Sequence, residues 1–420
     1  MTENWLIRPI AAEEFAALAQ VPGEAFLETS HPEAVELERQ VIEMDRTIAA
    51  FDGDAMVGSA AAYSVTLTVP GASAAAAGIT MVAVLPAYRR RGILSSMMNQ
   101  LLADADRRGE PLAILFASES GIYGRFGFGL ASSHLGFRIG RGEGTLAIGD
   151  LAADLDKVRL KPATPVKVQS ELAAVYDQVA AGRPGMLARD GRWWQYLLSD
   201  PEPHRDGMSP LRCMLAEDDS GPRGYALYRT KPTWGQDGLP AGLLRVRELM
   251  SIDPHATAGL WTNLLNRDLV AEIWAPLRPV DDPLLAMLAD RRRARPALGD
   301  GLWVRLIDLP GALCGRRYAA DIDVVLDVVD THFAANDGRW RLTARGLEPG
   351  GHETAASCQR VTDAADLKLS AAALGAAYLG GGKFGQLAAA GHVLEMTPGS
   401  LARLSAAMSW DPAPWSGTIF

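Results

Sequence analysis

The chain has 420 residues, of which 48% are hydrophobic and 22% charged, a composition typical of a folded protein with two or three domains. Its net charge of −9 argues against nucleic acid as the main partner and favours a basic ligand. The three cysteines are scattered, which predicts a cytoplasmic protein, and the seven histidines lack metal-ligand spacing, which predicts no metal. The acidic N-terminal sequence predicts no signal peptide, and the lack of an apolar run of about 18 residues predicts no membrane span.

Residues 1–154 are expected to form a first α/β domain. "NWLIRPI" predicts a strand, residues 11–18 predict a helix, and "TIAAFDGDAMVGSAAAYSVTLTV" predicts a hairpin that turns at Asp52-Gly53. "GITMVAVL" and "PLAILFAS" are continuous apolar runs, as in strands that are buried on both faces. Between these two runs, apolar residues at helical spacing follow Gly92 and predict a helix that ends at Gly109.

Residues 155–299 repeat part of this order. "GPRGYALYRT" and "LLRVRELMSIDPHATAGLWTNLLN" predict a hairpin, a strand, a proline and a helix. When Pro254 is aligned with Pro86, Thr257, Ala258 and Gly259 stand where the first domain has three arginines, so the architecture is repeated and the charged turn is lost. Residues 300–420 are expected to form a third domain, with strands in "DGLWVRLIDLPGAL" and "DIDVVLDVVD" and helices in "SAAALGAAYLGG" and "TPGSLARLSAAMS". The expected fold class is α/β (α+β) throughout.

Three arginines and a glycine, Arg89 to Gly92, stand where a buried strand leads into a helix. A helix N-terminus offers unpaired N–H groups and the positive end of a dipole, and a glycine lets a phosphate approach the backbone. Arginines add charge and forked donors. Arg89–Ser95 therefore predicts a pyrophosphate-binding turn, the alternative being a solvated basic helix start. It has neither the GxxxxGK[ST] pattern nor the three spaced glycines of a dinucleotide fingerprint.

The spacing of arginine, glycine and helix after this strand resembles the coenzyme A signature of the GNAT acyltransferase superfamily, with Leu94 where a glycine or alanine is usual. Together, "AVLPAYRRRGIL", "ASESGIYGRFGFG" and the terminal Phe420 resemble the Eis (enhanced intracellular survival) family of N-acetyltransferases, which acetylate aminoglycosides at several amines. The resemblance implies tandem GNAT domains, the second degenerate, a C-terminal sterol-carrier-protein-like domain, acetyl-CoA as cosubstrate and a homohexamer.

The resemblance also implies roles for individual residues. Tyr123 would be the general acid that protonates the leaving thiolate, and a phenol with a pKa near 10 is protonated at neutral pH. The α-carboxylate of Phe420 would fold back into the first domain as the base, and Phe26 and Glu28 would line the amine pocket. The coenzyme would be held by Val82, Ala83, Val84, Arg90, Arg91, Gly92, Ile93, Leu94, Ser95, Ser118 and Glu119.

The expected reaction is direct transfer of an acetyl group to a primary amine of a polycationic small molecule, in a ternary complex. No cysteine nucleophile is expected near the site, because all three cysteines lie beyond residue 200. Ile419 stands where an acidic residue can help to bind the aminoglycoside in the family. Two alternatives remain open, a non-catalytic acyl-CoA sensor or scaffold, and a lipid carrier based on the third domain.

Overall fold

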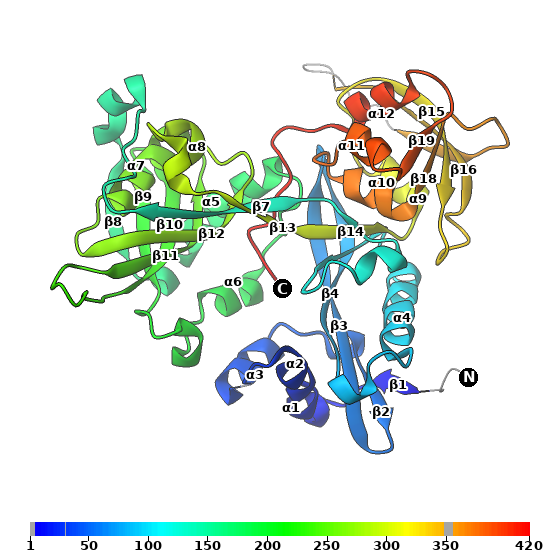
Figure 1. Cartoon of the computed structure of the whole chain (residues 1–420), viewed down its shortest axis with the longest axis horizontal. Helices are drawn as coiled ribbons and strands as arrows, with labels where there is room; N and C mark the ends of the chain where they lie inside the picture. Colours follow the sequence, from blue (N-terminus) through cyan, green and yellow to red (C-terminus); the bar gives the residue numbers. More distant parts are fainter. Residues whose placement is uncertain (1–4, 30, 348–355) are drawn as a thin grey trace. The chain divides into compact units, whose positions relative to one another are not determined.

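The computed structural model describes residues 5–29, 31–347 and 356–420. The chain forms two compact units (Figure 1). The first unit comprises residues 1–132, 183–187 and 300–420, and the second comprises 133–182 and 188–299. The first unit therefore combines segments that are far apart in the sequence. The boundaries expected at 154/155 and 299/300 stay a prediction.

A mixed seven-stranded sheet forms the N-terminal part of the first unit. Asp52 pairs with Ala55, so the expected hairpin turn is confirmed. The strand expected at "GITMVAVL" begins earlier than predicted, because Pro70-Gly71 turns the chain into a second, long hairpin. The sheet order is β1 (Leu6–Pro9), β2 (Thr47–Asp52), β3 (Ala55–Val69), β4 (Ala72–Val84), β5 (Leu112–Phe116), β14 (Leu302–Leu306), β6 (Gly129–Leu130).

Helix α4 (Ile93–Arg107) packs its apolar stripe on one face of this sheet. The stripe buries Met97, Met98 and Leu101 against alternate residues of β3, β4 and β5, which confirms the helix predicted between Gly92 and Gly109. The remaining helices of this part precede β2; they are α1 (Phe15–Leu18), α2 (Gln20–Phe26) and α3 (Pro32–Arg39).

A five-stranded sheet forms the C-terminal part of the first unit, in the order β17 (Ser357–Arg360), β16 (Gly338–Ala344), β15 (Ile322–Val329), β18 (Leu367–Ser370), β19 (Val393–Glu395). Its helices are α9 (Leu309–Cys314), α10 (Ala371–Tyr378), α11 (Phe384–Ala389) and α12 (Ser400–Met408). The strand predicted over "DGLWVRLIDLPGAL" was partly wrong. Its first half is β14, but "LPGALC" is a helix because the Asp308 carboxylate accepts a hydrogen bond from Gly311 N at 3.1 Å and caps it.

The second unit has its own seven-stranded sheet, in the order β13 (Ala297–Asp300), β7 (Ser133–Gly140), β12 (Val270–Pro279), β11 (Gly242–Ser251), β10 (Gly221–Lys231), β9 (Arg212–Asp218), β8 (Arg159–Ala163). Its helices are α5 (Gln169–Gly182), α6 (Gly191–Leu198), α7 (Pro254–Leu265) and α8 (Leu284–Met287). The expected order of hairpin, strand, proline and helix is confirmed by β9, β10, β11 and α7.

Helix α7 starts differently from its counterpart α4. It begins directly at Pro254, so Thr257, Ala258 and Gly259 lie buried inside the helix instead of forming a turn before it. The Asp253 carboxylate caps α7 by accepting a hydrogen bond from Ala256 N at 2.9 Å. A negative side chain thus occupies the place where the start of α4 is open to an anion.

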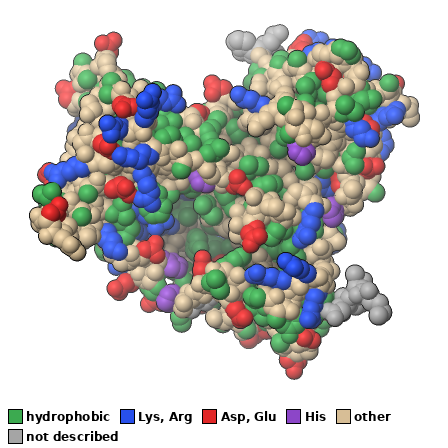
Figure 2. Space-filling view, viewed as in Figure 1, with side chains coloured by type: hydrophobic (Ala, Val, Ile, Leu, Met, Phe, Trp, Pro, Cys, Tyr) green, Lys and Arg blue, Asp and Glu red, His purple; other side chains and the backbone are tan. Residues whose placement is uncertain are grey.

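Among the described residues, no helix is long and apolar enough to cross a membrane. On the face that Figure 2 shows, acidic and basic side chains occur over both units.

Candidate active site

Strands β4 and β5 separate within the first sheet. Their parallel pairing runs from Ala76 opposite Leu112 to Gly78 opposite Ile114, although β4 continues to Val84. A bulge in β4 bends the strand, because Met81 has a φ of +52° and its carbonyl accepts a hydrogen bond from Ser59 Oγ at 2.7 Å. The described β4–β5 ladder ends at Gly78, so the far end of β4 presents its backbone to the opening between the strands.

The turn before α4 has two residues in the left-handed region, Arg90 with a φ of +65° and Gly92 with a φ of +88°. A Cβ at Gly92 would meet no atom within 4 Å, so the backbone angle and not crowding favours glycine there. Ser96 N closes the first turn of α4 on Gly92 O at 3.0 Å. The preceding N–H groups of Ile93, Leu94 and Ser95 have no intrahelical acceptor and point out of the helix start, where they can bind an anion.

A cavity of about 620 Å³ joins this helix start to the opening of the sheet. It is lined by Tyr123, Phe26 and ten of the eleven residues expected to hold the coenzyme. Arg91 is the exception, and its guanidinium lies over the Tyr88 ring, 5.4 Å from the centroid. The full lining is Ala25, Phe26, Val82, Ala83, Val84, Tyr88, Arg89, Arg90, Gly92, Ile93, Leu94, Ser95, Ser118, Glu119, Ile122, Tyr123 and Arg125.

Two polar residues of the lining, Tyr88 and Arg125, were missed from the sequence, whereas Arg89 belongs to the predicted pyrophosphate-binding turn. Arg89 connects two elements, because its guanidinium donates to Val84 O at 3.3 Å and to Ala25 O at 3.1 Å. Tyr88 donates to Asp52 Oδ2 at 3.0 Å. Arg125 belongs to the same turn as Tyr123, so its place two residues after the proposed acid was the available signal.

Tyr123 begins the 3₁₀ turn Tyr123–Phe126 and lines the cavity. The residue is 5% exposed, and its ring packs edge-on against Phe128 with centroids 6.2 Å apart. Burial raises the pKa of the Tyr123 phenol above its ordinary value near 10, so the hydroxyl keeps its proton at neutral pH. Phe126 and Phe128 are buried beside Tyr123 and pack the turn.

The Tyr123 turn is supported by residues that lie beyond position 300 in the sequence. Arg305 forms a buried ion pair with Asp330 at 2.6 Å, and a Cβ at Gly127 would collide with Arg305 Nη1. His332 Nε2 lies 2.6 Å from Arg125 O, within hydrogen-bond distance. These contacts span about 200 residues of sequence, and no local pattern predicts them.

The ring of Phe420 lies where β4 and β5 begin to separate. It packs edge-on against Phe116, with centroids 5.5 Å apart, and against Tyr63 at 6.2 Å. A Cβ built on Gly78 would lie 3.1 Å from Phe420 Cε2, so the glycine makes room for the ring. Because side chains alternate along strands, Tyr63, Gly78 and Phe116 lie on the face of the sheet opposite α4. Figure 1 shows the chain end, marked C, beside these strands.

The two residues expected in the amine pocket lie at the end of α2. Phe26 is the last residue of this helix, is 43% exposed and lines the cavity. Leu27 has a φ of +62° and ends the helix. Glu28 is exposed and does not belong to the lining of the cavity.

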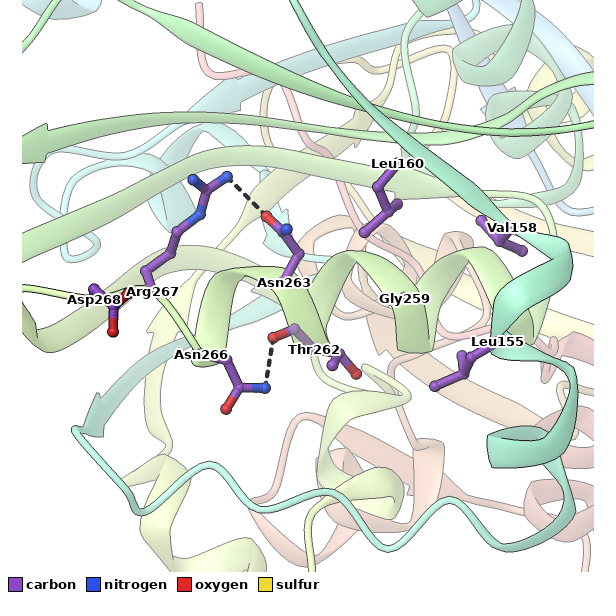
Figure 3. Close-up of a pocket in the computed structure, with 9 residues that line it drawn as sticks. All are labelled: Leu155, Val158, Leu160, Gly259, Thr262, Asn263, Asn266, Arg267 and Asp268. Atoms are coloured by element: carbon purple, nitrogen blue, oxygen red, sulfur yellow. Dashed lines mark hydrogen bonds between the residues drawn. The ribbon is translucent and has the colours of Figure 1, made fainter.

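A hollow of about 570 Å³ in the second unit lies along α7 (Figure 3). Leu155, Val158 and Leu160 form its apolar wall. On the opposite side, Arg267, which follows the end of α7, donates to Asn263 Oδ1 at 2.8 Å. This hollow follows the middle and end of α7, so it does not correspond to the cavity at the start of α4.

Comparison with known families identifies the domains of the chain. Family models described as "Acetyltransferase (GNAT) domain" match residues 6–131 and 185–306, and the "Sterol carrier protein domain" matches residues 309–417. Fold and site therefore define a GNAT N-acetyltransferase with two GNAT domains and a sterol-carrier-type C-terminal domain. A GNAT domain implies an acyl-CoA donor.

Individual relatives show to which family of GNAT N-acetyltransferases the chain belongs. An "Uncharacterized N-acetyltransferase" of Streptomyces avermitilis is 44% identical over 90% of both chains, and "N-acetyltransferase Eis" of Mycobacterium tuberculosis is 32% identical over 92% of both. The crystal structure of Eis1 from Mycobacterium abscessus has a TM-score of 0.81 at 30% identity, covering 99% of this chain and 100% of that one. The chain belongs to the Eis family of GNAT N-acetyltransferases.

Proposed function

We propose that the protein transfers the acetyl group of acetyl-CoA to a primary amine of a polycationic small molecule, such as an aminoglycoside, at one or several amines. The observation that carries this proposal is that the N-terminus of α4, Tyr123 and the end of β4 that is not paired with β5 all line one cavity. A pyrophosphate would bind at Gly92–Ser95 and Arg90, and the pantetheine would lie along Val82–Val84.

The transfer would proceed in one ternary complex. The amine lone pair attacks the thioester carbon, a C–N bond forms, and the C–S bond then breaks. A backbone N–H at the end of β4 stabilises the oxyanion that develops on the carbonyl oxygen. The departing thiolate takes the Tyr123 proton, which the buried phenol holds at neutral pH.

The ammonium proton would pass to the α-carboxylate of Phe420, directly or through one water. The placement of the Phe420 ring beside Gly78 supports this role, because it brings the chain end to the opening between β4 and β5. An α-carboxyl group has an ordinary pKa near 3.5, so it is ionised at neutral pH and orients an ammonium as well as accepting its proton. Tyr123 would thus protonate the leaving thiolate, and the Phe420 carboxylate would accept the proton of the attacking amine.

The acceptor class rests on three supports. The net charge of −9 attracts polycations, Phe26 lines the cavity beside the α4 turn, and the relatives named Eis are N-acetyltransferases. Ile419 is 58% exposed and presents no carboxylate to a polyamine. We therefore expect a preference among amines that differs from that of a chain with an acid at this position.

The test is thiol release from acetyl-CoA with a panel of aminoglycosides, linear polyamines and lysine peptides, with product masses recorded. Wild type, Tyr123→Phe and the control Tyr196→Phe, which lies outside the cavity, are compared. Turnover with at least one amine, lost in Tyr123→Phe and kept in the control, supports the proposal. Binding of acetyl-CoA without turnover on any amine favours the acyl-CoA sensor, and binding of lipid without binding of acetyl-CoA favours the lipid carrier.

A further inference from the structure

Residues 183–187 form a short segment between α5 and α6, two helices of the second unit, but they belong to the first unit. On one side this segment pairs with the end of β3. Thr68 N donates to Met186 O at 2.8 Å, and Gly185 N donates to Thr68 O at 2.8 Å. Leu187 forms an antiparallel bridge with Leu67. The first sheet therefore fixes the segment in place.

On its other side the same segment holds the end of the chain. Trp415 N donates to Pro184 O at 2.9 Å, and Arg183 Nη1 donates to Ala413 O at 2.7 Å. Gly185 has a φ of +94°, and a Cβ there would lie 2.9 Å from Trp415 O. The backbone of the tail, residues 409–420, thus passes directly over a glycine that has no room for a side chain.

We propose that residues 183–187 are a positioning strap that seats the Phe420 carboxylate for catalysis. This inference rests on the proposed function, in which that carboxylate accepts the amine proton. It gives residues 183–187 a part in the reaction, although the strap itself touches no reacting atom.

The physical argument concerns the freedom of the tail. After α12 ends at Met408, the described tail contains no helix or strand. A base on a free chain end would be present at the amine only part of the time, and proximity accounts for much of its effect. The strap fixes the tail at Ala413 and Trp415, and Trp415, Ser416 and Thr418 are buried. Only the last few residues then remain to be placed, and the aromatic contacts of Phe420 place them.

The seating of the tail can be measured without any acetyl transfer. Carboxypeptidase A releases C-terminal aromatic residues, so the rate at which the intact mass loses Phe420 reports how often the tail leaves its seat. We expect Arg183→Ala to lose Phe420 about fivefold faster than wild type, which is the effect of one net hydrogen bond on an equilibrium. Gly185→Ala should lose it faster still, because both its backbone angle and the Trp415 contact oppose a side chain. The control Gly182→Ala, where a Cβ meets no atom within 4 Å, should match wild type.

The same variants are then assayed for acetyl transfer and for coenzyme A binding. If the strap seats the carboxylate, the variants that lose Phe420 faster should have the lower kcat, and the dissociation constant of coenzyme A should be unchanged. Tail release equal to wild type in both Arg183→Ala and Gly185→Ala would overturn the strap. Faster release with undiminished kcat would leave the strap as a structural contact and refute the Phe420 base of the proposed function. If Gly185→Ala fails to fold, the milder Arg183→Ala decides between these outcomes.

Discussion

Replacing Gly92 with alanine isolates the contribution of the α4 turn to coenzyme binding. The φ of Gly92 is +88°, and a new methyl group would meet no atom within 4 Å. The cost is therefore conformational alone, about 1–2 kcal/mol for an L-residue in the left-handed region. Gly92 is exposed, so in the free protein the turn can relax to other angles. Coenzyme binding must then restore the left-handed angle, and the cost appears in affinity.

We expect Gly92→Ala to raise the dissociation constant of coenzyme A about fivefold to thirtyfold, the range that corresponds to this cost. Isothermal titration calorimetry measures the affinity, and urea unfolding measures the stability. Gly109→Ala is the matched control, because Gly109 has a φ of +71°, also has an open surrounding and lies just after the same helix, outside the cavity. Equal losses of affinity in the two variants, or no loss of affinity and stability in Gly92→Ala, would refute this reasoning.

Three further predictions concern the Tyr123 turn. Tyr123→Phe should lower kcat about 100-fold or more and leave coenzyme affinity unchanged, as stopped-flow and titration would show. Because burial raises the pKa of Tyr123, activity that needs its proton should persist above pH 10 and fall as pH rises through the folded-state pKa, whereas Tyr123→Phe should lack this limb of the pH profile. Arg305→Met should destabilise the protein by about 3–5 kcal/mol in urea, because it leaves Asp330 buried without its cation. Loss of the exposed ion pair between Arg341 and Asp323 is the control and should leave the urea midpoint close to that of wild type.

The elements of the coenzyme half of the site were predictable from the sequence. A continuous apolar strand, a proline, arginines, a glycine and a helix-spaced stripe lie within residues 79–105, and each has a local physical meaning. The helix formed as predicted, and ten of the eleven expected coenzyme residues line one cavity. Arg91 differs because its side chain stacks on Tyr88, a contact that no spacing rule encodes.

The contacts between distant segments could not be predicted. Strand β14 inserts beside β5 although about 190 residues separate them, and it carries the Arg305 that supports the Tyr123 turn. Gly78 reads as an ordinary small residue within a strand, and only the structure shows that it accommodates the Phe420 ring. Tertiary packing decides which distant segments come into contact, and no local pattern in a single sequence reveals these contacts. The hexamer and the cytoplasmic location stay predictions.

The central claim is that Tyr123 and the end of the chain act together at the opening between β4 and β5. Deleting Phe420 alone tests it most directly, with kcat measured at saturating acetyl-CoA and the best amine of the panel, and coenzyme A affinity measured in parallel. The account predicts a fall in kcat of about 100-fold or more, as for loss of a general base, with unchanged coenzyme affinity. Wild-type turnover by the shortened chain would contradict it.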